Sequence, residues 1–236
     1  MYINDISEDY NAFDNFWYKA RRNLLKILLN KHKVKNASIV EVGCGAGSQL
    51  LSLKEFSNSL DGCDICKNSI ALATNLNVAN LFVCDIESNV LSKKYDVICS
   101  FDVLEHINND TVAIKNIYKS LSPQGLFFFS VPACKLIFSG HDKSSGHFRR
   151  YSKKEIKNKL EEQGFEILEL YYWNSILFPL LSLKRLISKN KNKSDIDYYS
   201  GLEKILFQVL SLENFLIKKG CKFLFGASLI GVARRL

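Results

Sequence analysis

Three apolar runs near the start of the chain each lead into residues that could bind a cofactor. The first run is followed by a turn with three glycines in the string EVGCGAG, namely Gly43, Gly45 and Gly47. Glycines at such a turn let the backbone approach a ligand and open a helix whose amino end faces it. The second run ends at Asp64 and the third at Asp85. Because the ends of successive parallel strands meet at one edge of a sheet, these groups are predicted to face one crevice.

The two aspartates indicate a ligand that contains a nucleoside. Asp64 could accept hydrogen bonds from both ribose hydroxyls, and Asp85 could reach an adenine amino group. A dinucleotide fingerprint would place a third glycine where this chain has Ser48. Glu41 would be a poor neighbour for a pyrophosphate, but it suits the cationic amino and sulfonium groups of S-adenosylmethionine. The pattern therefore favours S-adenosylmethionine over a nicotinamide cofactor, with local pairing of Glu41 as the alternative.

Two histidines are candidates for a catalytic base, because imidazole titrates near neutral pH. His106 lies in the string DVLEH and His147 in the string GHFRRY. If the ligand donates a methyl group, positioning and exclusion of water do much of the work, and a base is needed only when the acceptor carries a proton of high pKa. The alternative for each histidine is a structural role.

Other side chains could serve an anionic acceptor. Arg149 and Arg150 could hold a phosphate or carboxylate that Tyr151 orients, the alternative being a salt-bridged surface loop. Trp17 and Arg21 lie one turn apart in a predicted opening helix, so both could cover the crevice as a lid. The alternative there is a helix docked by its aromatic side chains.

These residues require a sheet that brings the strand ends together. Apolar runs at 39–42, 60–63, 81–84, 97–101, 126–131 and 165–173 alternate with amphipathic segments, which predicts a parallel sheet with crossover helices. Ser152 and Glu155 have the spacing of a capping box, for a helix that ends near Gly164. Helices near 175–187 and 201–219 and a last strand within 223–234 are also expected.

Five strings between residues 38 and 132 resemble, in family order, the class I S-adenosylmethionine-dependent methyltransferases, in particular the group that includes the ubiquinone-biosynthesis type. They are IVEVGCGAG, LDGCDICKNSIALA, VCDIES, YDVICSFDVLEHI and LSPQGLFFFSVP. The resemblance implies an α/β fold with a Rossmann-like seven-stranded sheet, mostly parallel with an antiparallel last strand, and helices on both faces. It also implies a single domain over 1–236, with a helical lid (1–37), a cofactor-binding core (38–173), a helical insertion (174–222) and the last strand (223–236).

The resemblance also assigns the cofactor site by position. The first strand end would hold the methionine part, the second the ribose and the third the adenine, with an aromatic residue after the fourth strand. The implied set is Glu41, Gly43, Gly45, Gly47, Asp64, Ile65, Asp85, Ile86 and Phe101. Asp102, Glu105 and His106 match the spacing by which some ubiquinone-pathway relatives bind a divalent cation, but no fourth ligand can be located and no metal is predicted.

The resemblance is weaker outside the core and does not identify the acceptor. FWYKARR, GHFRRYSKKEI and FGASLIGVARR look like bacterial methyltransferases often associated with surface-glycan or lipid pathways. Many of these relatives have His where this chain has Asn15, and Pro where it has Leu224. The predicted function is methyl transfer to a small-molecule, lipid or glycan-pathway acceptor, and the alternatives are an RNA methyltransferase or a cofactor-binding module without turnover.

Composition limits the cellular context. With 236 residues and 47% hydrophobic content, the chain is typical of one soluble domain. The first ten residues are polar and acidic and the apolar stretches are too short to span a bilayer, so a cytoplasmic protein is expected. Seven cysteines suit reduced thiols, and the Cys63–Cys66 pair lacks the second pair of a zinc site. An RNA partner is disfavoured because no RNA-binding motif is visible.

The last third of the chain combines positive charge with apolar faces. Residues 152–236 hold 15 of the 32 Lys and Arg but only 9 of the 24 Asp and Glu. The predicted helix 201–219 carries an apolar stripe with Glu213 near it, a carboxylate that needs a partner, and the preceding helix ends in a cluster of cations: Lys184, Arg185, Lys189, Lys191 and Lys193. This pattern predicts an anionic partner or peripheral contact with the inner face of a membrane, against dimerisation or core packing as alternatives.

Overall fold

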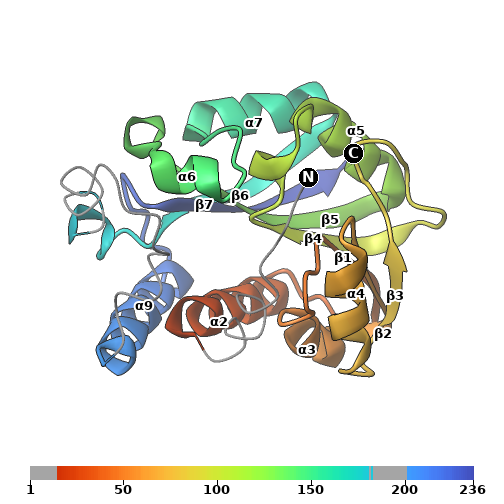
Figure 1. Cartoon of the computed structure of the whole chain (residues 1–236), viewed down its shortest axis with the longest axis horizontal. Coiled ribbons are helices and arrows are strands. Elements are labelled where there is room, and N and C mark those ends of the chain that lie inside the picture. The colour runs from red at the N-terminus through yellow and green to blue at the C-terminus, as the bar shows by residue number, and fades with distance from the viewer. Residues whose placement is uncertain (1–14, 181, 183–200) are drawn as a thin grey trace.

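The computed structural model describes residues 15–180, 182 and 201–236, which form a seven-stranded sheet between two layers of helices (Figure 1). The strand order is β3-β2-β1-β4-β5-β7-β6. β7 runs antiparallel to both β5 and β6, and the other neighbouring pairs are parallel. The predicted fold class is confirmed.

The strands coincide with the predicted apolar runs. They are β1 (Ala37–Val42), β2 (Ser57–Asp64), β3 (Asn80–Val83), β4 (Tyr95–Phe101), β5 (Leu121–Pro132), β6 (Phe165–Trp173) and β7 (Ser228–Arg235). β7 begins at Ser228 rather than at residue 223, because its pairing with β5 and β6 begins at that residue. Strand pairing, rather than the apolar run 223–227, decides where this strand begins.

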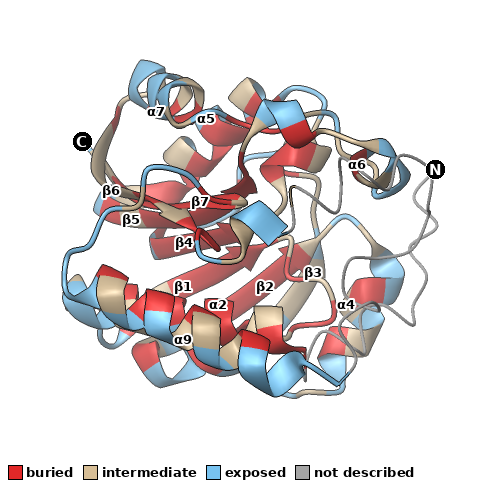
Figure 2. Cartoon of the chain, turned by 90° about the vertical axis from the view of Figure 1, so that its left-hand side faces the viewer, coloured by how far each residue is buried: buried red, intermediate tan, exposed pale blue. Residues whose placement is uncertain are grey.

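Helices cover both faces of the sheet. The helices α2 (Phe16–Lys31), α3 (Leu50–Leu53) and α9 (Glu203–Lys218) pack on one face, and α4 (Lys67–Thr74) adjoins them. The opposite face is covered by α5 (Asp110–Ser120) and α7 (Lys153–Glu162), with the short α6 (Gly140–Ser144) beside them. Buried residues gather on the strands and on the helix faces that meet them (Figure 2).

Capping residues set the starts of two helices that bear on the site. The Asn15 side chain accepts a hydrogen bond from the Trp17 amide and begins α2. Ser152 accepts one from the Glu155 amide and begins α7, as predicted. The Glu155 carboxylate does not complete the capping box, because it pairs with Lys135. The chain leaves α7 through Gly164, whose φ of +95° suits a residue without Cβ.

The second half of the chain departs from prediction at one helix. Residues 175–177 are not helical, and helical structure begins at residue 178. The amides of Ser175 and Ile176 instead donate to the buried Glu213 carboxylate of α9, at 2.9–3.1 Å. The expectation that Glu213 needs a partner is thereby confirmed. Residues 183–187, which end the predicted helix, and the predicted lysine cluster lie outside the described residues.

Candidate functional site

The glycine turn joins the ends of β1 and β2 to the loop after β4. The amides of Gly43 and Cys44 donate to the Cys63 carbonyl at 2.7 and 3.0 Å. Gly43 has a φ of +74°, and a Cβ there would lie 2.2 Å from Cγ2 of Val103. The first glycine is therefore needed for close packing of two loops, rather than only for the approach of a ligand as the sequence suggested.

Glu41 lies at the end of β1 with its carboxylate enclosed. Its side chain is buried, and Oε2 has no hydrogen-bond partner among the described residues. Burial raises the pKa of Glu41 well above its ordinary value, and the nearby Arg21 opposes this effect. A buried carboxylate oxygen without a partner is a strong acceptor for a cationic or hydrogen-bonding group. Local pairing at the strand end, the alternative to ligand binding, does not satisfy this oxygen.

Arg21 reaches the same place from α2. Its guanidinium forms an ion pair with Asp102 and lies over the rings of Tyr18 and Phe101, 5.0 and 5.5 Å from the ring centroids. Asp102, which follows β4 with a φ of +55°, also accepts a hydrogen bond from Ser130 at 2.9 Å. The Nε atom of Arg21 has no partner among the described residues. The helix α2 thus places a cation near Glu41.

Trp17, the other predicted lid residue, packs elsewhere. Its ring contacts Trp173 of β6 edge-on, with 4.8 Å between centroids. The Trp173 indole donates to Asn214 of α9, whose amide donates to the Ala20 carbonyl of α2. Trp17 therefore docks α2 through aromatic packing, which is the structural alternative considered from the sequence.

Asp64 closes the glycine turn from the neighbouring strand. Its two carboxylate oxygens accept the amides of Gly45 at 3.0 Å and Cys66 at 2.8 Å. The carboxylate is half-buried, and each oxygen keeps a second lone pair for a ligand hydroxyl. The next side chain, Ile65, is 58% exposed and offers an apolar surface beside this carboxylate.

At the end of the third strand, the aspartate forms hydrogen bonds with residues that follow it closely in the chain. Asp85 accepts the Glu87 amide at 2.9 Å and the Ser88 hydroxyl at 2.6 Å. Ile86 and Phe101 are buried in the protein core. The predicted contact of Asp85 with adenine stays a prediction, because local hydrogen bonds account for its orientation. The ring of Phe101 lies next to the guanidinium of Arg21.

The two candidate histidines, 41 residues apart, lie side by side. Their rings meet edge to face, with 4.6 Å between centroids. His106 ends a 3-10 turn (Leu104–His106) after β4, and the Phe148 amide donates to the Glu105 carbonyl in this turn at 2.8 Å. Burial and the neighbouring His147 lower the pKa of His106 to about 4. His106 is therefore neutral at pH 7.

His147 is oriented by a carboxylate that sequence reasoning missed. Its Nδ1 lies 3.1 Å from Oδ1 of Asp142, a residue of α6 with no exposed side-chain surface. Asp142 also accepts a hydrogen bond from Nε of Arg150 at 2.8 Å and another from the Ser139 amide at 2.8 Å. Hydrogen bonds and charge from His147 and Arg150 hold the pKa of Asp142 well below its ordinary value, against the effect of burial.

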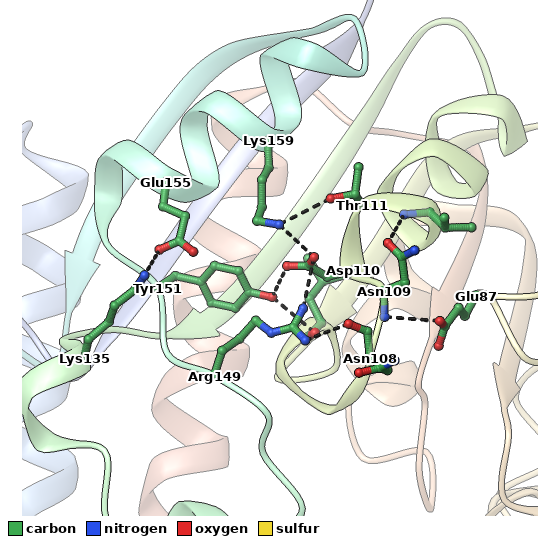
Figure 3. Close-up of polar contacts among 12 residues, drawn as sticks. Glu87, Asn108, Asn109, Asp110, Thr111, Lys135, Arg149, Tyr151, Glu155 and Lys159 are labelled. Carbon is green, nitrogen blue, oxygen red and sulfur yellow. Dashed lines mark hydrogen bonds and ion pairs between the residues drawn. The ribbon is translucent and has the colours of Figure 1, made fainter.

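The other polar residues of the GHFRRY segment form hydrogen bonds and ion pairs within the protein, and Figure 3 shows those of Arg149 and Tyr151. The buried Tyr151 hydroxyl donates to Asp110 at 2.8 Å, and Asp110 also pairs with Lys159 and Arg149 at 2.8 and 3.0 Å. Arg150 is 4% exposed and contacts Asp142 and the Ala133 carbonyl. These contacts favour the structural alternative for Arg149, Arg150 and Tyr151. A substrate role for Arg150 and Tyr151 stays a prediction.

A set of possible metal ligands also lies here. One ligand atom each of Glu105, His106 and His147 fall within 4.8 Å of one another. Glu105 is buried, and its Oε2 has no partner among the described residues. This trio could hold a divalent cation, whereas the sequence pattern had pointed to Asp102 in place of His147. None of the seven cysteines, all of which lie in the described part of the chain, forms a disulfide.

The arrangement fits S-adenosylmethionine better than a dinucleotide. An enclosed carboxylate at Glu41 and a half-buried one at Asp64 suit an amino group, a sulfonium and ribose hydroxyls. Sequence patterns indicated both carboxylates. They did not indicate Asp102 or Asp142 as partners of Arg21 and His147, because no local spacing links residues so far apart.

Comparisons with known proteins identify the family to which the chain belongs. A family profile described as a methyltransferase domain matches residues 10–170. The malonyl-[acyl-carrier protein] O-methyltransferase of Bacillus cereus is 32% identical over 134 residues, which are 54% of this chain and 50% of that protein, so the chain spans half its length. The ubiquinone biosynthesis O-methyltransferase of Rickettsia bellii is 24% identical over 78% of this chain and 82% of that protein. A solved S-adenosylmethionine-dependent methyltransferase from Clostridium acetobutylicum shares the fold, with a TM-score of 0.61, 12% identity and 92% of both chains covered.

Proposed function

The chain belongs to the methyltransferase-domain family, whose members use S-adenosylmethionine, and from this premise we propose that it methylates a small-molecule or lipid-linked acceptor. The observation that carries the proposal is the pair of carboxylates, Glu41 and Asp64, around the glycine turn. Glu41 has a buried oxygen without a partner, and Asp64 has lone pairs left beside an exposed Ile65. These groups support one cofactor orientation, with its cationic end at Glu41 and its ribose at Asp64.

Bound S-adenosylmethionine supplies a methyl carbon that its positive sulfur has already activated. The chain then has three tasks, which are to orient the cofactor, exclude water and place the acceptor in line with that carbon. Glu41 and Asp64 serve the first task. Arg21, with its free Nε, lies at the cationic end of the site and could hold the cofactor carboxylate.

The histidine pair supports an acceptor that loses a proton. His147 is 15% exposed, whereas burial and the neighbouring His147 lower the pKa of His106 to about 4. A group that binds a proton so weakly is a poor base at neutral pH. We therefore assign proton removal to His147 and a packing role to His106.

Transfer of label from methyl-labelled S-adenosylmethionine to lipid, glycan and RNA pools of a cell extract tests the function. The proposal expects label in the lipid or glycan pool with the intact protein, and His147→Ala should lower transfer while leaving cofactor affinity nearly unchanged. Label in RNA would support the alternative acceptor. Tight cofactor binding without label in any pool would support a binding module.

A lipid-linked acceptor is favoured by the surface of α9 and the loop that follows it. Along α9, Ile205, Leu212 and Phe215 are 57, 54 and 52% exposed. Leu224, in the loop before β7, is 88% exposed. An open pocket of about 430 Å³ lies between residues 175–179 and 222–225, at the same end of the molecule (Figure 1). We call these exposed residues of α9 and the loop the α9 surface.

Charge favours an anionic partner for the α9 surface. Within residues 202–225 the charged side chains are Lys204, Lys218, Lys219, Lys222, Glu203 and Glu213. Because Glu213 is buried, the exposed charges of these residues are four lysines and one glutamate, which leaves a positive excess. Apolar side chains beside lysines are the pattern of a surface that binds anionic lipid at the membrane interface. No helix in the described part of the chain is long and apolar enough to cross a membrane.

Cosedimentation with vesicles tests this contact. The protein should bind phosphatidylcholine vesicles that contain phosphatidylglycerol, and binding should weaken at high salt. The double variant Leu212→Glu with Phe215→Glu should lose binding, while the control Leu51→Glu, at a 47% exposed leucine of α3, should keep it. A stable dimer that leaves vesicles unbound would instead assign the surface to a subunit interface.

A further inference from the structure

The contacts of His147 define which of its ring nitrogens is protonated. Asp142 has no exposed side-chain surface and accepts hydrogen bonds from Arg150 and the Ser139 amide. A carboxylate with such partners is ionised and can only accept hydrogen bonds. The 3.1 Å contact from Oδ1 of Asp142 to Nδ1 of His147 therefore places the proton on Nδ1. In the neutral ring, Nε2 then carries a lone pair.

The surrounding groups keep this arrangement rigid. The His147 amide donates to the Asp142 carbonyl at 2.8 Å, and Arg150 donates to the Ala133 carbonyl at 3.0 Å. The Phe148 amide ties the segment to Glu105 in the turn after β4. Among the residues that the structure describes, the titratable groups near His147 are Asp142, His106 and Glu105. Burial raises the pKa of Glu105 well above its ordinary value, and the charge of Asp102 acts in the same direction.

The histidine pair is electrostatically continuous with the cofactor end of the site. Asp102 pairs with Arg21, and its negative charge raises the pKa of both Glu105 and His106. The positive charge of Arg21 in turn lowers the pKa of Glu41, against the larger effect of burial. One line of interacting groups thus runs from the cationic end of the predicted cofactor site to the His147 ring.

We propose that Asp142 is a positioning residue that holds His147 with Nδ1 protonated, so that Nε2 removes the proton of an oxygen or nitrogen acceptor. This inference rests on the proposed function. As the bond from the acceptor atom to the methyl carbon forms, the carbon–sulfur bond breaks and sulfur keeps both electrons. The acceptor proton passes to Nε2, and Asp142 stabilises the resulting imidazolium. The site is therefore specific for acceptors with an ionisable O–H or N–H group.

Long-range ¹H–¹⁵N NMR of the whole protein tests the tautomer without any acceptor. Neutral His147 should show the Nδ1-protonated form in the wild type, and Asp142→Asn should change it to a mixture or to the Nε2-protonated form. The matched control is Asp110→Asn, which alters another buried aspartate, at the start of α5, that contacts Arg149, Lys159 and Tyr151 rather than a histidine. It should leave the His147 signals unchanged. An Nε2-protonated His147 in the wild type would overturn the proposal, even if Asp142→Asn does not fold.

Turnover gives the second readout, with the pool that accepts label as substrate. Asp142→Asn should lower kcat about 10- to 100-fold with little change in KM, a range typical of disturbing a general base. Asp142→Glu should recover part of the rate, and Asp110→Asn should keep kcat near the wild-type value. Equal losses in the two asparagine variants would reduce Asp142 to a structural role. Absence of label in every pool would defeat the proposed function while leaving the tautomer result intact.

Discussion

Two regions of this protein differ in whether their buried polar groups have hydrogen-bond partners. Around the ends of β1 and β4, four enclosed atoms have no partner among the described residues, and they are Arg21 Nε, Glu41 Oε2, Ser100 Oγ and Glu105 Oε2. In the segment before α7 and at the start of α5, which it contacts, Asp110, Asp142 and Tyr151 each have two or more partners. Because unsatisfied buried groups are unfavourable, they persist where a ligand completes them. We propose that the first region, called the binding region below, binds the cofactor, and that the second, called the supporting region, fixes the loops and side chains beside it.

Removing a carboxylate from the binding region should produce the largest change. Asp64→Ala should weaken S-adenosylhomocysteine binding about 100-fold, because two hydrogen bonds to a charged acceptor contribute about 3 kcal/mol together. Isothermal titration calorimetry measures the change. Asp96→Ala, which removes an aspartate that accepts the Ser38 amide at the start of β1, is the control. Unchanged affinity, with NADH bound instead, would contradict the site.

Removing a hydroxyl from the supporting region should change stability instead. Tyr151→Phe should lower the free energy of unfolding by about 1–2 kcal/mol, because buried Asp110 and the Leu104 carbonyl lose a donor. Urea denaturation measures the loss, and cofactor affinity should stay within about twofold of wild type. The control Tyr118→Phe removes a hydroxyl that contacts the exposed Leu236 carbonyl, and it should change stability by less than about 0.5 kcal/mol. A matching loss of cofactor affinity in Tyr151→Phe would erase the distinction between the regions.

The pH dependence of stability should also separate the regions. The folded-state pKa of Glu41 is raised, so the folded state binds this proton more tightly and stability falls as pH rises above the unfolded pKa. Between that pKa and the folded one, Glu41 contributes about 1.4 kcal/mol of loss per pH unit. Glu41→Gln should therefore flatten the profile above about pH 5, as measured by denaturation at successive pH values. The exposed Glu55→Gln should leave the slope unchanged, and an unaltered slope in Glu41→Gln would show that this carboxylate is not enclosed.

Substitutions of two helix-capping residues should produce the smallest effects and should differ only in their effect on cofactor affinity. Asn15→Ala at α2 and Ser152→Ala at α7 should each lower stability by about 1 kcal/mol in thermal melts. Only Asn15→Ala should also weaken S-adenosylhomocysteine binding, by roughly two- to fivefold, because α2 carries Arg21 to Asp102. Equal effects of the two substitutions on affinity would mean that α2 does not belong to the binding region.

Local sequence patterns were sufficient for the sheet and for the strand ends that carry the predicted cofactor residues. Apolar runs bounded by polar turns located all seven strands, because strand burial depends on residues a few positions apart. The glycine turn, Asp64 and the Ser152 cap were visible for the same reason. The helix expected from residue 175 was wrong at its start, because apolar periodicity does not report that Glu213 binds the amides of Ser175 and Ile176.

The sequence by itself determined the fold class, the order of the elements and the positions of Glu41, Gly43 and Asp64 at strand ends, since these follow from periodicity and backbone geometry within short windows. Only the tertiary structure decided which charges meet. Arg21 and Asp102 are 81 residues apart, and Tyr151 and Asp110 are 41 apart. No pattern of spacing marks such partners, because they meet only when sheet order and loop packing bring separate segments together.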